Sequence, residues 1–88
     1  MTLVRDKMNG RTAYAQKVTA HMFRPDHPLH IKGLRYTRCP RLKKRIVVAP
    51  QWYGSDYACI GDYIVKDWRG LWPCTRHNFH EWFEKVNV

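Results

Sequence analysis

Short apolar runs in the second half of the chain are separated by turn residues, a pattern that is typical of short β-strands. Gly61 and Asp62 predict one turn, residues 67–70 predict another, and Pro73 is expected to end the last strand. The predicted strands are residues 46–49, 57–60, 63–66 and 71–72. Together they predict a β-meander.

Apolar residues near the C-terminus follow a helical period instead. Four of them recur at i, i+3, i+4 and i+7 and predict one apolar helix stripe: Phe79, Trp82, Phe83 and Val86. Asn78 followed by Glu81 resembles a capping box, and Thr75 is an alternative N-cap. A helix this short is not stable alone, so its stripe is expected to pack on the sheet.

The first half is less regular. Residues 12–23 fit a short helix or a strand, and the β-branched pair at 18–19 favours the strand. Two prolines within residues 24–28 predict a loop. Residues 29–38 fit a basic strand, which Pro40 ends.

The whole chain is therefore predicted to form one α+β domain, residues 1–88. Its expected architecture is a small antiparallel β-sheet of four or five strands with a C-terminal amphipathic helix packed on one face. Residues 1–42 would form a basic N-terminal part, and residues 43–88 the β-meander and the helix.

Composition indicates a folded protein outside the membrane. The chain is 44% hydrophobic and 14% aromatic, which argues against disorder. No run approaches the roughly 18 apolar residues of a membrane span, and residues 1–6 show no secretory signal. Three cysteines without paired spacing suit a reducing compartment. We expect a soluble protein in the cytoplasm where it is made.

Charge is strongly segregated along the chain. The formal net charge is +9, but residues 1–45 hold twelve Lys and Arg against Asp6 and Asp26, a net charge of +10. This segregation predicts a contact surface for a polyanion or an acidic protein. We call its members the basic patch: Arg24, Lys32, Arg35, Arg38, Arg41, Lys43, Lys44 and Arg45. Three aromatic residues nearby are candidates for stacking: Tyr36, Trp52 and Tyr53.

Residues 43–86 resemble the small bacteriophage proteins of the PGDYG family. The resemblance is carried by Gly61-Asp62-Tyr63-Ile64-Val65, Gly70, Trp72-Pro73-Cys74, Phe79, Phe83 and Glu84, and upstream by Lys43-Lys44-Arg45-Ile46-Val47-Val48 and Gln51-Trp52. Ile60 stands where the family has a leading proline, and His77 where an acidic residue is common. The resemblance implies a phage or prophage origin. The family has no established activity, so no functional residues are carried over.

Metal and catalytic sites are not predicted. Structural zinc sites usually have two paired ligand sets, and neither Cys74 with His77 and His80 nor the histidines at 21, 27 and 30 supply them. Cys59 or Cys74 beside a histidine is a weak nucleophile pattern, and a core role fits Cys74 better. We therefore expect a protein that is not an enzyme and that needs no cofactor.

Two functions fit the basic patch. The first is a phage accessory protein in the host bacterial cytoplasm that binds and modulates or inhibits a host nucleic-acid-processing complex, with a recombination nuclease, RNA polymerase or a CRISPR effector as candidate partners. The alternative is direct, weakly sequence-specific binding of DNA or RNA through phosphate contacts. No known nucleic-acid-reading motif is present in the sequence.

Overall fold

A five-stranded antiparallel sheet joins strands from both ends of the chain. The structure is a computed structural model and describes residues 1–49 and 56–86. The strands of this large sheet lie in the order β7-β6-β2-β1-β8. Their bounds are Thr2–Asp6 for β1, Thr12–Lys17 for β2, Tyr63–Asp67 for β6, Gly70–Cys74 for β7 and Phe83–Lys85 for β8.

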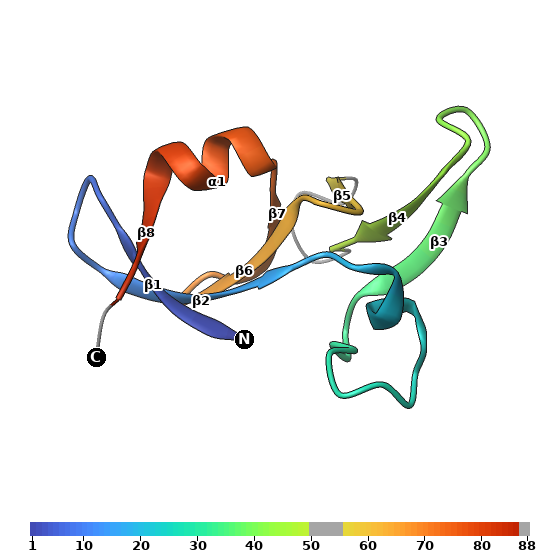
Figure 1. The fold of residues 1–88 in the computed structure, drawn as a ribbon, viewed down its shortest axis with the longest axis horizontal. Coiled ribbons are helices and arrows are strands. Elements are labelled where there is room, and N and C mark those ends of the chain that lie inside the picture. Colours follow the sequence, from blue (N-terminus) through green and yellow to red (C-terminus); the bar gives the residue numbers. More distant parts are fainter. Residues whose placement is uncertain (50–55, 87–88) are drawn as a thin grey trace.

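Alternation of side chains gives the large sheet a core face and an outer face. In β2, Ala13 and Ala15 are buried whereas Tyr14 between them is 50% exposed. The buried face packs against helix α1 (Arg76–Trp82), which lies across it (Figure 1). Alanine is small, so the helix can lie close to the centre of this sheet.

Helix α1 is fixed at its start and at its centre. The Thr75 hydroxyl accepts a hydrogen bond from the Asn78 backbone N–H at 3.3 Å, so Thr75 is the N-cap. The Phe79 ring stacks on Tyr63 of β6 with centroids 3.7 Å apart. Phe79 and Phe83 are both buried in the first core cluster, with Val4 and Val65 of the sheet.

Three further strands form a smaller antiparallel sheet. β3 (Arg35–Cys39), β4 (Lys44–Val48) and β5 (Tyr57–Cys59) lie in that order. The short β5 pairs only with the inner part of β4, from Ile46 to Val48. β3 and β4 therefore extend away from the large sheet as a two-stranded hairpin (Figure 1). We call residues 35–48 the arm.

A second core cluster anchors the base of the arm. Short 3₁₀ helix η1 (Ala20–Phe23) follows β2 and places Met22 in this cluster. Its fully buried members are Val18, Met22, Val47, Ala58 and Ile64. Because these residues come from both sheets and from η1, the arm is held to the outer face of the large sheet at its base.

The α+β class holds in its coarse form, since antiparallel strands and one C-terminal helix are present. The strands form two sheets where one was expected, and the expected meander is divided between them after β5. Of residues 12–23, for which a strand was favoured, residues 12–17 form β2 but residues 20–23 form the 3₁₀ helix η1. The loop at 24–28 is confirmed. The basic strand expected at 29–38 covers only Arg35–Cys39.

Three local expectations near the C-terminus were wrong. Pro73 lies inside β7 and does not end it. Proline has no backbone N–H, but β7 is an edge strand, so no hydrogen bond to a neighbouring strand is lost on its open side. The capping box expected at Asn78 is absent, and the alternative N-cap Thr75 is the residue that caps the helix. The helix ends at Trp82, which is 42% exposed, so the expected stripe is reduced to Phe79 within the helix and Phe83 in β8.

We expect Phe79→Ala to lower the free energy of unfolding by about 3 kcal/mol, because it removes a stacked ring from the first core cluster. Trp82→Ala is the matched control, and its half-exposed ring should cost only about 1 kcal/mol. Urea unfolding followed by circular dichroism measures both values. A larger loss for Trp82→Ala than for Phe79→Ala would contradict this placement of the helix.

Candidate functional site

Two arginines lie side by side on one face of the arm. Arg38 of β3 and Arg45 of β4 are direct cross-strand partners, so their side chains leave the same face. Both are exposed. The ion pairs within residues 1–49 and 56–86 join Asp67 to Arg69, Asp62 to Arg76 and Glu81 to His77, and none involves the arm. Like charges placed opposite one another destabilise a strand pair, so an anion between these arginines would relieve repulsion.

Cations also occupy the other face and the tip of the arm. Arg35 and Lys44 lie on the face opposite to Arg38 and Arg45, and both are exposed. Residues 40–43 form the loop at the tip, and Arg41 and Lys43 there are exposed. The arm therefore presents positive charge along both sides and at its end.

The backbone of Lys43 is strained. Its φ of 54° lies in the left-handed region, where a side chain is disfavoured and glycine is the usual residue. Among the described residues outside glycine, it alone has a positive φ. A lysine at this position therefore lowers the free energy of unfolding relative to a glycine.

The inner end of the arm is packed rather than open. The Arg45 guanidinium lies 5.3 Å from the centroid of Phe23 in η1. The Tyr36 ring lies between Phe23, with centroids 5.2 Å apart, and His30, at 4.5 Å. The Tyr36 hydroxyl accepts from the Ile31 N–H at 2.9 Å and donates to the Ile31 carbonyl at 3.1 Å. Burial raises the pKa of Tyr36, and the hydrogen bond to Ile31 only partly offsets it.

The structure brings together six of the eight basic-patch residues on the arm. Arg24 and Lys32 lie in the loop between η1 and β3, at the far end of β3 from the tip. The Tyr36 ring packs against Phe23 and His30, so it is not part of the exposed contact surface. Trp52 and Tyr53, the other stacking candidates, lie outside the described residues.

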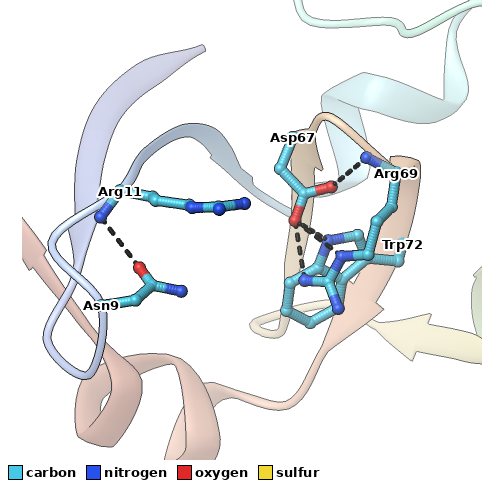
Figure 2. A network of polar contacts seen from close by, with 5 residues as sticks. All are labelled: Asn9, Arg11, Asp67, Arg69 and Trp72. Atoms are coloured by element: carbon cyan, nitrogen blue, oxygen red, sulfur yellow. Dashed lines mark hydrogen bonds and ion pairs between the residues drawn. The ribbon is translucent and has the colours of Figure 1, made fainter.

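The carboxylate of Asp67, at the turn between β6 and β7, is hydrogen-bonded to Arg69 and Trp72 (Figure 2). It accepts hydrogen bonds from the Arg69 backbone N–H at 2.8 Å, from the Arg69 guanidinium at 2.8 Å and from Trp72 Nε1 at 3.0 Å. Burial acts to raise the pKa of Asp67, but these hydrogen bonds outweigh it and the net pKa is lowered. This carboxylate is thus committed to the turn.

Cys74 is a buried core thiol. Its burial, with a smaller contribution from the charge of Asp62, raises its pKa to about 11. The thiolate that a nucleophile requires is therefore scarce at neutral pH. Nowhere in residues 1–49 and 56–86 do three or more His, Cys, Asp or Glu side chains gather as metal ligands would.

Two exposed aromatic residues were missed by the sequence analysis. Trp68, in the turn between β6 and β7, is 77% exposed, and Tyr14 at the centre of the large sheet is 50% exposed. Tyr14 falls within residues 12–23, which fit a short helix or a strand with the strand favoured, and Trp68 was assigned only to a turn. A tryptophan between Asp67 and Arg69 in a turn was the available signal, because apolar strand alternation does not require it there.

We expect Asp67→Asn to lower the free energy of unfolding by about 1–2 kcal/mol at pH 7, because it weakens charged hydrogen bonds to a partly exposed arginine. The pKa of Asp67 is below its ordinary value of 3.8 when folded, so its contribution is complete above that value and is lost as pH falls through the folded pKa. Urea unfolding at neutral and acidic pH measures the difference. Asp26→Asn, an exposed loop carboxylate, is the control, and an equal effect of both variants would refute the assignment.

Across the described ranges 1–49 and 56–86, no helix is long and apolar enough to cross a membrane. The resemblance to PGDYG proteins stays a prediction. No family model matches the chain, and no curated protein or solved structure is significantly similar to it.

Proposed function

We propose that this protein binds nucleic acid through phosphate contacts made by the arm. The observation that carries the proposal is the cross-strand pair Arg38 and Arg45, two exposed arginines held opposite each other with no ion pair to a carboxylate in the described part of the chain. A phosphate between them would accept hydrogen bonds from both guanidinium groups. Arginine suits this role because its planar fork matches phosphate oxygens.

The shape of the arm supports a duplex as the partner. A two-stranded β-ribbon is narrow enough to enter the major groove of DNA, which is about 12 Å wide. Cations on both faces, from Arg38 and Arg45 on one side to Arg35 and Lys44 on the other, would meet the phosphate chains that border the groove. This arrangement assigns the arginines and the lysine to phosphates, which carry no sequence information, and none of them to base edges. Binding is therefore expected to be weakly sequence-specific.

The other function predicted from the sequence is modulation of a host nucleic-acid-processing complex in a bacterial cytoplasm. It rests on the family resemblance and on the same charges, which would also suit an acidic protein surface. The two functions differ in what the arm touches. A pulldown from bacterial lysate treated with nuclease would recover one defined protein complex if the arm binds protein. If the arm binds nucleic acid, the nuclease would remove that ligand and no defined protein complex would be recovered.

We expect the double variant Arg38→Ala/Arg45→Ala to bind a short DNA duplex about 10-fold more weakly or worse at 0.1 M salt, because two phosphate contacts are lost. The plot of log affinity against log salt should become shallower by about 1.8, at about 0.9 for each phosphate. Fluorescence anisotropy with a labelled duplex measures both quantities. Lys17→Ala/Lys85→Ala makes the same change in net charge on exposed residues of β2 and β8, and should have much smaller effects.

Equal losses in the two double variants would show that only total charge matters and would contradict binding by the arm. Wild-type protein that leaves duplex unbound at low salt would remove the proposal itself.

Lys43→Gly should separate stability from binding. Glycine accepts the left-handed backbone at the tip, so the free energy of unfolding is expected to stay the same or rise by up to about 1 kcal/mol. Duplex affinity should nevertheless fall several-fold, because one tip cation is removed. Thermal unfolding and anisotropy measure the two effects. If Lys43→Gly destabilises the fold or leaves affinity unchanged, this lysine is not retained for binding.

A further inference from the structure

The outer face of the large sheet carries an open aromatic and basic region beyond the arm. Tyr14 of β2 is paired with Lys66 of β6, so the two side chains leave the sheet on the same side. This is the face opposite to helix α1, since Ala13 and Ala15 point to the helix. Ile64 lies on the same face and is covered by the second core cluster, whereas Tyr14 and Lys66 are exposed.

Trp68 is held beside this region by the turn that follows β6. The Arg69 guanidinium contacts two indoles, lying 5.4 Å from the centroid of Trp68 and 5.1 Å from that of Trp72. Asp67 binds the same guanidinium, as Figure 2 shows, so the cation is fixed on one side of Trp68. Trp68 is nevertheless 77% exposed. Trp68 is a candidate contact residue, because tryptophan is enriched among the residues that carry most of the binding energy at interfaces.

A hollow of about 310 Å³ lies between these aromatic residues, lined by Thr12, Ala13, Tyr14, Lys66, Asp67 and Trp68. Arg11 and Trp68 also line a smaller hollow that shares Thr12 and Ala13 with it. The Arg11 side chain extends toward the Asp67 end of the turn (Figure 2). The hollow therefore combines two aromatic rings with nearby cations.

The charge around the hollow is unbalanced toward cations. Two carboxylates line the hollows: Asp67 is bonded to Arg69, and Asp6 accepts a hydrogen bond from the Met8 backbone N–H at 2.8 Å, while the cations there are Arg11, Lys66 and Arg69. Neither Arg11 nor Lys66 forms an ion pair with a carboxylate in the described ranges. Two cations are therefore left for an anionic ligand beside the rings.

We propose that Tyr14 and Trp68, with Lys66 and Arg11, form a second nucleic-acid site that binds single strands by base stacking. This inference rests on the proposed function, because it assumes that the chain binds nucleic acid, but it assigns a different surface and a different strand state. The rings would stack on bases, and the cations would bind the phosphates that follow them.

The rings select single strands for a geometric reason. Inside a duplex each base is already stacked on its neighbours above and below, so its flat faces are not open to a protein ring. In a single strand the bases can turn outward and stack on Tyr14 or Trp68. The arm would then bind the phosphates of single-stranded or double-stranded nucleic acid, and the hollow on the large sheet would bind unpaired bases.

The test compares a labelled oligothymidylate with a duplex of equal length by fluorescence anisotropy. Trp68→Ala and Tyr14→Ala are each expected to weaken single-strand binding about 5-fold or more, which is the lower end of what one stacked base contributes. Duplex binding should change less than about 2-fold, because the phosphate contacts of the arm remain. Trp82→Ala is the matched control, since it removes a tryptophan that is 42% exposed on helix α1, on the other side of the sheet.

Each outcome is distinct from a failure of the arm. If Arg38→Ala/Arg45→Ala weakens binding of both strand states while Trp68→Ala and Tyr14→Ala match the wild type, the arm stands and the stacking site is refuted. If the aromatic variants lose single-strand binding and the arginine variant does not, the stacking site stands and the arm is refuted. Equal loss of both strand states in the aromatic variants also refutes stacking. So does a monomer–dimer shift of Trp68→Ala in sedimentation, because it would assign the hollow to a second copy of the chain.

Discussion

The structure depends on one strand that is buried on both sides. Ile64 and Val65 are neighbours in β6, point to opposite faces of the large sheet and are both 0% exposed. Val65 packs in the cluster under helix α1, and Ile64 packs in the cluster that holds the arm. The helix and the arm are therefore fixed to the same strand from opposite sides, and burial of about two full side chains there contributes several kcal/mol to the fold.

Because the arm is anchored only at its base, its outer half is free to carry charge that a core could not tolerate. Arg38 and Arg45 lie beyond the last residue that pairs with β5 and are exposed, so solvent screens their repulsion, and the Arg45 guanidinium also lies over the Phe23 ring. Among the described residues, the carboxylates that take part in ion pairs are Asp67 of β6, Asp62 of the turn before β6 and Glu81 of helix α1, and none of them lies on the arm. The positive charge is thus kept apart from the negative charge by the architecture.

Local patterns predicted the strands of the second half well, since alternation and turn residues are properties of neighbouring positions. They failed where a distant partner decides. Phe83 fits a helix stripe in sequence, but the chain leaves the helix there because Phe83 pairs with Asp6 at the other end of the chain. Pro73 is tolerated because its strand has no partner on one side. Trp68 could be assigned to a turn, yet the Arg69 contact that holds its ring depends on the folded turn.

The sequence by itself determined that the chain is cationic in its first half, that it folds into short antiparallel strands with a C-terminal helix, and that arginines and lysines crowd residues 35–45. Only the tertiary structure decided that those cations stand on a projecting hairpin, that Arg38 faces Arg45, and that Tyr14 and Trp68 border one hollow. The physical reason is that charge and periodicity are carried by each residue or its neighbours. Strand register and the division into two sheets are instead set by burial of apolar residues that lie far apart in the chain.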